Sequence, residues 1–166
     1  MNTSTFSIKV YKEYFNFASS HFMIFKDGSR EPLHGHNYRV KLRGNALELD
    51  NDMVFDFLDI KPIVREVCDR LDHHLLIPIN NKLIEVIEKD KNVEIKTPDG
   101  SFFSIPKQDT LLLPIENTSV ERIAVYLAHQ IKNEVHKKFG FEFSELEIEV
   151  EETRGQSAVF LLKKEL

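Results

Sequence analysis

Three histidines in the first quarter of the chain, His21, His34 and His36, have a spacing that suits a metal site. His34 and His36 lie two residues apart at the start of a predicted strand, so both side chains leave the same face and can converge on one ion. His21 ends the preceding predicted strand, and antiparallel pairing would bring it beside them. Three nitrogens leave the fourth tetrahedral position of Zn²⁺ open, as in a catalytic site. An isolated His-x-His pair, by contrast, is more often ordinary surface chemistry.

Other groups that could do chemistry allow two interpretations each. Asp72 and His73 can form a proton relay in which the carboxylate orients the imidazole, or they can simply close a helix whose dipole favours a charged histidine. The residues alone favour the second interpretation. The single cysteine, Cys68, is spaced with the apolar face of a predicted helix, which indicates inert packing.

The composition of the 166-residue chain predicts one soluble domain with one core. Hydrophobic residues make up 42% of the chain and the net charge is −5, so a nucleic-acid partner or an anionic membrane surface is not expected. One cysteine cannot form an intramolecular disulfide, and the N-terminus lacks the pattern of a secretory signal. There is no apolar stretch near 18 residues, and we therefore expect a cytoplasmic protein.

The elements that must position the histidines follow from hydrophobic periodicity. Residues 38–43 alternate apolar and basic, which predicts a half-exposed strand, and residues 5–18 predict an antiparallel partner. A helix is predicted from its N-cap at Asp56 onward, because apolar residues recur there at three and four positions. A second helix is predicted from a capping box that begins at Thr118, and it ends at Gly140.

The rest of the chain adds strands. Residues 145–151 and 157–163 predict two strands, and residues 93–105 predict a hairpin around Pro98-Asp99-Gly100. Residues 83–91 allow neither helix nor strand to be assigned. The order strand-strand, helix, hairpin, helix, strand-strand predicts an α+β fold with an antiparallel sheet.

Several motifs together resemble the 6-pyruvoyl-tetrahydropterin synthase family, which also includes 6-carboxy-tetrahydropterin synthase. The resemblance extends over most of the chain, which is read as a single domain over residues 1–166, with an insertion at about 88–113. The motifs that carry it are Phe17-Ala18-Ser19-Ser20-His21, Leu33-His34-Gly35-His36-Asn37-Tyr38, Met53-Val54-Phe55-Asp56-Phe57, Leu71-Asp72-His73-His74-Leu75, Asn117-Thr118-Ser119-Val120-Glu121 and Glu152-Thr153.

The resemblance implies a fold and an assembly. Members share the tunnelling fold, a four-stranded antiparallel sheet with two helices on one face. Their trimers close the sheets into a barrel, two trimers commonly form a hexamer, and active sites lie between subunits. The resemblance therefore implies a homo-oligomer, trimer or hexamer, that binds Zn²⁺ and a small-molecule pterin triphosphate.

The resemblance also implies roles for individual residues. The Asp72 and His73 pair would exchange a proton with the substrate, with His74 the weaker candidate. Glu152 would hold the pterin ring, because a carboxylate can accept two parallel hydrogen bonds from the ring N–H and the 2-amino group. Thr118 and Ser119 fall in the segment that contacts the pterin, whereas Glu147 and Glu149 are read as ordinary strand glutamates.

The chain departs from the usual family pattern just before the His-Gly-His motif. Pyruvoyl and carboxy members have a cysteine there, whereas residues 28–33 contain none, and Glu31 is the group expected to replace it. A glutamate branch known from some bacteria and apicomplexan parasites cleaves 7,8-dihydroneopterin triphosphate to 6-hydroxymethyl-7,8-dihydropterin for folate synthesis. This sequence resembles that branch, with Glu31, Asp72 and His73 as catalytic residues and Lys26 and Arg30 as candidates to receive the triphosphate.

Three alternatives stay open on sequence grounds. Two are enzymatic: formation of 6-pyruvoyl-tetrahydropterin by triphosphate elimination, or of 6-carboxy-tetrahydropterin on the route to queuosine and other deazapurines. The third is a non-catalytic zinc-binding assembly protein that retains the fold, which a fourth protein ligand closing the metal site would favour.

Overall fold

The central element of the fold is a long strand, β3 (His34–Ala46), that alternates apolar and basic side chains. Tyr38, Val40 and Leu42 are almost completely buried on one face. On the other face Arg39 and Lys41 lie opposite glutamates of a neighbouring strand, with Lys41 Nζ 2.9 Å from Glu149 Oε1. The alternation predicted over residues 38–43 is therefore confirmed, and it divides the sheet into an apolar and a charged face.

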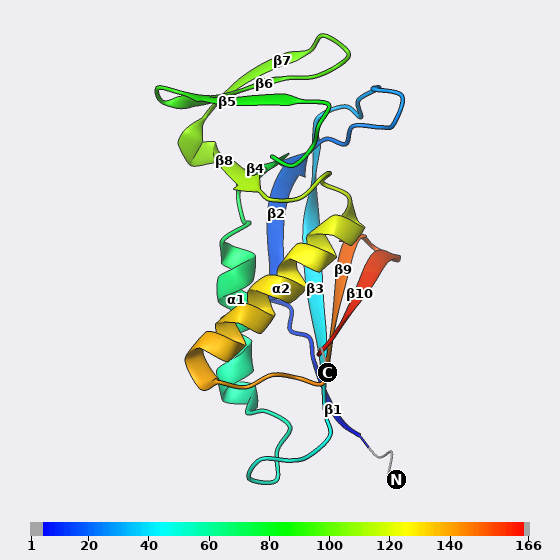
Figure 1. Ribbon diagram of the computed structural model, residues 1–166, viewed down its shortest axis with the longest axis vertical. Coiled ribbons are helices and arrows are strands. Elements are labelled where there is room, and N and C mark those ends of the chain that lie inside the picture. The colour runs from blue at the N-terminus through cyan, green and yellow to red at the C-terminus, as the bar shows by residue number, and fades with distance from the viewer. Residues whose placement is uncertain (1–4, 165–166) are drawn as a thin grey trace.

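A computed structural model describes residues 5–164 and shows two helices covering the apolar face of a seven-stranded sheet (Figure 1). The helices are α1 (Phe57–Asp69) and α2 (Val120–Phe139), with a short 3-10 helix η1 (Lys107–Asp109). The other strands are β1 (Phe6–Val10), β2 (Asn16–His21), β4 (His74–Pro78), β5 (Glu85–Lys89), β6 (Asn92–Lys96), β7 (Phe102–Pro106), β8 (Thr110–Leu113), β9 (Glu145–Thr153) and β10 (Gln156–Lys163).

The strand order is β10-β9-β3-β2-β4-β8, with β1 paired to the far end of β3. The first four strands are antiparallel, as expected for the tunnelling fold, and the short β4 and β8 extend this sheet with parallel pairings. The apolar side chains of α1 and α2 pack on the apolar face of the sheet and form the main core together with the strand residues beneath them. Within the described residues no helix is long and apolar enough to cross a membrane.

The single strand predicted for residues 5–18 is wrong, because a turn divides it into β1 and β2. Val10 pairs with Leu42 and Asn16 pairs with Arg39, so five residues of the N-terminal segment face only two residues of β3. The turn places Phe15 in the core, where it is fully buried. Burial of this aromatic ring explains why the chain leaves regular pairing here.

The N-cap predicted for the second helix is also wrong by one residue. Ser119, not Thr118, caps α2, with its hydroxyl accepting from the backbone N–H of Arg122 at 3.4 Å. The hydroxyl of Thr118 is fully buried and donates instead to the carbonyl of Phe22 at 2.7 Å. The cap of α1 at Asp56 and the end of α2 at Gly140, with φ 65°, are confirmed.

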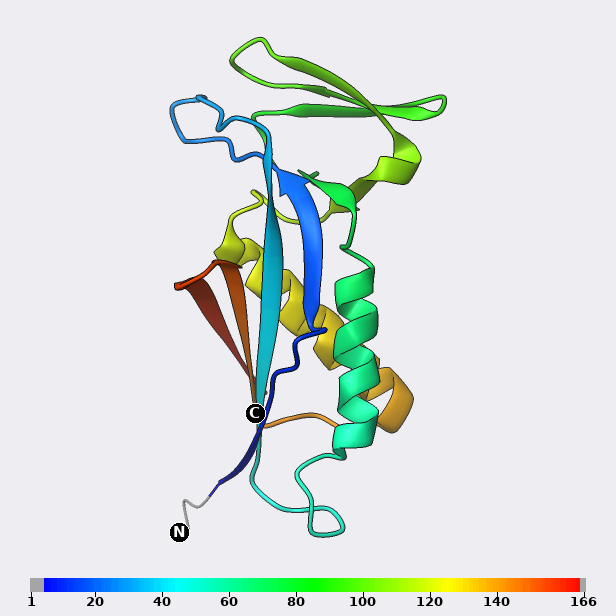
Figure 2. The ribbon, with the colours of Figure 1, turned by 180° about the vertical axis from the view of Figure 1, so that it is seen from behind.

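The insertion expected at about 88–113 lies largely in a separate three-stranded antiparallel sheet of β5, β6 and β7, here called the inserted sheet. Its last residues form β8, which belongs to the main sheet. The predicted hairpin is β6 and β7, and the unassigned residues 83–91 contain β5. Figure 2 shows this sheet across one end of the main sheet, next to the loop that follows β2. The expectation of one core is wrong, because a second apolar cluster lies under the inserted sheet, built from Phe22, Ile24, Leu75, Ile77, Val93 and Ile95.

Candidate active site

The pairing of β2 with β3 brings the three histidines together. His21 lies directly opposite His34, and Ser19 lies opposite His36, so all three imidazoles project from the apolar face at one end of the two strands. The centroid of the His21 ring is 4.6 Å from that of His34 and 5.3 Å from that of His36. One nitrogen of each histidine lies within 4.8 Å of the others, which is close enough for the three to share a metal ion.

Two backbone carbonyls fix the orientation of these rings. His21 Nδ1 is 2.9 Å from the carbonyl oxygen of Thr118, and His34 Nδ1 is 2.8 Å from that of Pro32. A proton on Nδ1 satisfies each contact and leaves Nε2 as the free lone pair, as in most histidine metal ligands. His21 Nε2 is buried and has no hydrogen-bond partner among the described residues. A metal ion would satisfy this atom, so the triad fits one.

The protonation of His21 favours a ligand role as well. Burial lowers the pKa of His21, and the neighbouring His34 and His36 lower it further, against the opposing effects of the Thr118 carbonyl and the Glu152 carboxylate. A lowered pKa keeps the imidazole neutral near pH 7, and the neutral form is the one that binds metals.

Two carboxylates flank the histidine triad. Glu152 Oε1 lies 3.6 Å from Nε2 of both His21 and His36, and Glu31 Oε1 lies 4.0 Å from His34 Nε2. Their side chains are 23% and 33% exposed, so both can be reached from solvent. The second carboxylate oxygen of Glu31 is buried without a hydrogen-bond partner in the described part of the chain.

The position of Glu152 follows from the alternation of β9. It continues the row of Ile148 and Val150 on the apolar face, whereas Glu149 lies opposite Lys41 on the other face. A cavity of about 320 Å³ beside it is lined by His36, Asn37, Arg39, Glu151, Glu152, Thr153 and Arg154. The distinction drawn from the sequence between Glu152 and the other strand glutamates agrees with this geometry.

Asp72 and His73 form the predicted pair, but they lie away from the histidine triad of the same chain. His73 Nδ1 is 2.9 Å from Asp72 Oδ2, and Asp72 Oδ1 accepts from the backbone N–H of Ala18 at 2.7 Å. His73 has φ 60°, its N–H donates to the carbonyl of Ala18, and its side chain is 84% exposed. Burial opposes ionisation of Asp72, but its hydrogen bonds from Ala18 and His73 outweigh this effect and lower its pKa.

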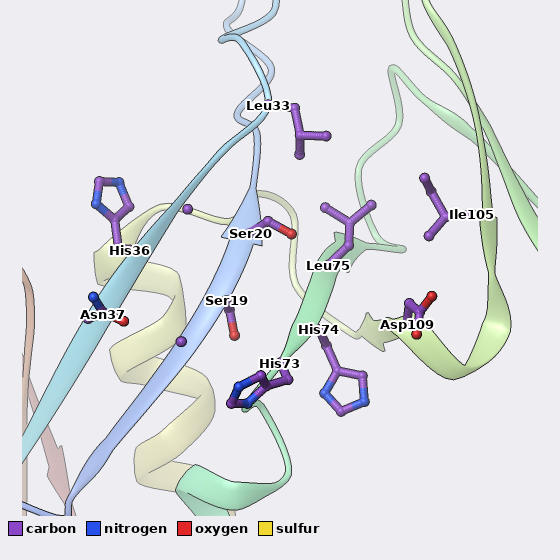
Figure 3. Close-up of a pocket in the computed structure, with 12 residues that line it drawn as sticks. Ser19, Ser20, Leu33, His36, Asn37, His73, His74, Leu75, Ile105 and Asp109 are labelled. Atoms are coloured by element: carbon purple, nitrogen blue, oxygen red, sulfur yellow. The ribbon is translucent and has the colours of Figure 1, made fainter.

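A cavity of about 460 Å³ lies on this other side of β2 and β3. Ala18, Ser20 and Asn37 line it, and they alternate along their strands with the residues of the apolar face. Figure 3 shows His73 and His74 on one side of the two strands and His36 pointing away from them. Ser19 and His36 also border this cavity, but in the described part of the chain no hydrogen bond or ion pair joins Asp72 or His73 to the histidine triad.

The contacts of Arg30, Lys26 and Cys68 bear on two other sequence expectations. The guanidinium of Arg30 donates to Asp99, Ser101 and the carbonyl of Glu31, so several of its roughly five N–H donors are already engaged. Lys26 is exposed. Cys68 is buried in α1, and burial raises the pKa of its thiol to about 12, which confirms that it is inert packing.

Two residues near the site belong to the motifs quoted from the sequence but were given no role there. Tyr38 continues the face of His34 and His36, with its ring centroid 5.6 Å from that of His36. Its hydroxyl is buried without a partner within residues 5–164, and burial, Glu152 and Glu31 raise its pKa. Asn117 binds both the N–H and the carbonyl of Ile24 and so ties the start of α2 to the end of β2. The two-residue spacing after His36 could have indicated that Tyr38 lies on the same face. No local pattern indicated the hydrogen bonds of Asn117.

The fold and the site define a tunnelling-fold protein with a three-histidine site that could hold a metal ion. Comparison with protein-family models matches residues 9–162 to the family described as 6-pyruvoyl tetrahydropterin synthase. The chain belongs to this family, and it is an enzyme of pterin metabolism.

Individual relatives agree with this assignment. A putative 6-carboxy-5,6,7,8-tetrahydropterin synthase of Methanocaldococcus jannaschii is 37% identical over 147 residues, which cover 87% of this chain and 88% of the relative. The crystal structure of 6-pyruvoyl tetrahydropterin synthase from Plasmodium vivax is 33% identical with a TM-score of 0.89, covering 97% of this chain and 99% of that one. A variant of the same P. vivax protein, equally similar, has alanine in place of a glutamate described as a catalytic residue.

We expect the histidine triad to bind one divalent metal ion per chain. Replacement of His21, His34 or His36 by alanine removes a ligand, so each variant should lose more than the roughly 10–100-fold in affinity that loss of an outer-shell partner costs. Titration with Co²⁺, followed by its visible absorption, measures this. The control is His129→Ala, an exposed histidine of α2. Equal Co²⁺ affinity in all four variants would rule out the triad as the site.

We also expect Asp72 to make folding pH-dependent at acid pH. Because its pKa is lowered in the folded state, the carboxylate stabilises the fold above its ordinary pKa of 3.8, and this contribution is lost as the pH falls through the lowered value. Asp72→Asn should lower the free energy of unfolding by about 1 kcal/mol at pH 7 and reduce its acid dependence. Denaturant titrations from pH 7 to pH 3 measure both effects. The control is Asp69→Asn, which breaks only an exposed ion pair with Arg65.

Proposed function

We propose that the protein is a zinc-dependent enzyme that cleaves the side chain of 7,8-dihydroneopterin triphosphate to 6-hydroxymethyl-7,8-dihydropterin for folate synthesis. The observation that carries the proposal is the carboxylate of Glu31, 4.0 Å from His34 Nε2, in the segment where pyruvoyl and carboxy members have a cysteine. The P. vivax relative, with its glutamate described as catalytic, supports the same assignment.

The nitrogens of His21, His34 and His36 would hold the zinc ion. A neutral three-nitrogen donor set with partly exposed carboxylates beside it suits Zn²⁺ with an open position. When bound, zinc supplies Lewis acidity that lowers the pKa of the substrate's side-chain hydroxyls.

The protein's own residues would then move two protons. Glu31 accepts the proton of the hydroxyl on the second side-chain carbon, whose oxygen becomes an aldehyde as the bond to the first carbon breaks. The bonding electron pair passes to the first carbon and the conjugated pterin ring, and a proton returned to that carbon completes the hydroxymethyl group. The second product is an aldehyde that retains the triphosphate, so no oxidant or reductant is needed.

Glu152 is proposed to hold the pterin ring during this reaction. It lies at the end of β9 beside the triad, and its carboxylate can accept two parallel hydrogen bonds from the ring. Thr118 and Ser119 would border the ring, although their hydroxyls also bind Phe22 and cap α2. Thr118 contributes in a second way, because its carbonyl orients His21.

The returned proton would come from Asp72 and His73 of a second copy of the chain. Their own triad lies on the other face of the sheet, and His73 is 84% exposed, as a group reaching into a neighbour would be. A cytoplasmic trimer or hexamer would also cover the open edge at β10, where Val159 and Leu161 are exposed. This arrangement makes the complete site dependent on assembly.

A second candidate is formation of 6-carboxy-tetrahydropterin, which the 37% identical M. jannaschii relative favours by its name. Against it, the only thiol of the chain is Cys68, buried in α1 with a pKa of about 12. Formation of 6-pyruvoyl-tetrahydropterin, favoured by the name of the P. vivax relative, meets the same difficulty. A non-catalytic role would require Glu152, 3.6 Å from two histidine nitrogens, to close the metal site.

Identification of the product tests the proposal directly. Zinc-loaded protein incubated with 7,8-dihydroneopterin triphosphate should yield 6-hydroxymethyl-7,8-dihydropterin and a triphosphate-bearing aldehyde in equal amounts, identified by chromatography and mass. Inorganic triphosphate with 6-pyruvoyl-tetrahydropterin, or 6-carboxy-tetrahydropterin with acetaldehyde, would instead support one of the alternative reactions. An absence of turnover by fully metallated oligomer would refute all the enzymatic assignments.

Glu31→Ala should lower kcat by about 10²–10⁴-fold, the usual contribution of a general base, and leave the zinc content unchanged. Metal analysis alongside steady-state kinetics separates the two effects. Glu88→Ala, which removes an exposed glutamate of the inserted sheet, is the matched control and should leave kcat unaltered. Undiminished turnover in Glu31→Ala would remove Glu31 from the mechanism.

A further inference from the structure

We propose that Arg30 is a positioning residue for Glu31 and that the inserted sheet of β5, β6 and β7 serves as the clamp that holds it. The inference rests on the proposed role of Glu31 as the base. It gives a function to the insertion, which within residues 5–164 makes no hydrogen bond or ion pair with the histidine triad.

The guanidinium of Arg30 joins the insertion to the main chain of Glu31. Its Nε donates to Asp99 Oδ2 at 3.2 Å and one terminal nitrogen donates to Ser101 Oγ at 3.2 Å, both in the turn between β6 and β7. The other terminal nitrogen donates to the carbonyl oxygen of Glu31 at 2.8 Å. A planar group with donors on both sides can make these contacts together, whereas a lysine ammonium cannot span them.

Two phenylalanine rings hold the same guanidinium in place. Its central carbon lies 5.1 Å from the ring centroid of Phe103 in β7 and 5.8 Å from that of Phe22, which follows His21. The two rings stack on each other at 5.2 Å. The side chain of Arg30 is only 17% exposed, so these cation–π contacts are shielded from solvent.

Asp99, which accepts from Arg30, is itself held by hydrogen bonds. Asp99 Oδ1 accepts from Thr97 Oγ1 at 2.5 Å and from the N–H of Ser101 at 3.0 Å. These hydrogen bonds lower the pKa of Asp99 to about 2, and the one from Thr97 has the largest effect. The carboxylate therefore keeps its charge near neutral pH.

Both backbone polar groups of Glu31 form hydrogen bonds. Its N–H donates to the carbonyl of Met23 at 2.9 Å, and its carbonyl accepts from Arg30. The next residue, Pro32, supplies the carbonyl that orients His34. The segment that carries the base lies outside regular secondary structure, apart from an isolated bridge at Arg30, so these contacts replace the support of a strand. A small displacement of such a group lowers the catalytic rate, because proton transfer requires close alignment.

The test uses Arg30→Gln and Asp99→Asn in zinc-loaded protein, with Lys96→Gln as the control. Lys96 makes an exposed ion pair with Glu85 inside the insertion and does not reach Arg30. The clamp variants should lower kcat by about tenfold, keep KM for the pterin triphosphate within about twofold and retain one zinc ion per chain. Hydrogen exchange of residues 25–33 should rise in both variants, while exchange in α2 stays unchanged.

Arg30→Lys distinguishes positioning from phosphate binding. A lysine satisfies a phosphate as a point charge but cannot reproduce the clamp, so Arg30→Lys should behave like Arg30→Gln. The proposal would be overturned if Arg30→Gln raised KM with normal kcat and Arg30→Lys restored KM. Unchanged hydrogen exchange of residues 25–33 in the clamp variants would overturn it as well. Failure of the proposed function gives a different result: full turnover in Glu31→Ala with exchange in residues 25–33 still raised by Arg30→Gln.

Discussion

The antiparallel register of β2 against β3 is the constraint on which the site depends. His21 lies opposite His34, and successive residues of a strand point to opposite faces, so this register places three imidazoles side by side on one face. A slip by one residue would turn His21 to the charged face and expose Phe17. Burial of Phe17, stacked on Tyr38 at 4.8 Å, therefore stabilises the same register that brings the three histidines together.

The two carboxylates beside the triad are positioned by different parts of the structure. Glu152 is placed by the regular alternation of a central strand, with its backbone in the sheet. Glu31 lies in a loop, and its backbone is held by Met23 and by Arg30. The loop before the histidines is also where this chain lacks the cysteine that its resemblance to the family leads one to expect.

The two faces of the sheet also separate the residues that are proposed to act in the reaction. The apolar face carries the triad near the start of α2, and the opposite face carries the cavity lined by His73. The backbone of Ala18 nevertheless forms hydrogen bonds with both Asp72 and His73. An exposed histidine with a fixed backbone agrees with the proposed site shared between subunits.

The sequence by itself determined the features that depend on local periodicity and spacing: the histidine triad, the cap at Asp56, the end of α2 at Gly140 and the hairpin in the insertion. It did not determine the division of the N-terminal strand, the role of Thr118 or the second core, because each depends on contacts between distant segments. Arg30 is the clearest example. A basic residue near an anionic substrate suggested phosphate binding, but tertiary contacts with Asp99 and Ser101, about 70 residues away, occupy its donors and direct it toward Glu31. Side-chain hydrogen bonds across such separations have no local sequence pattern, and only the folded chain decides them.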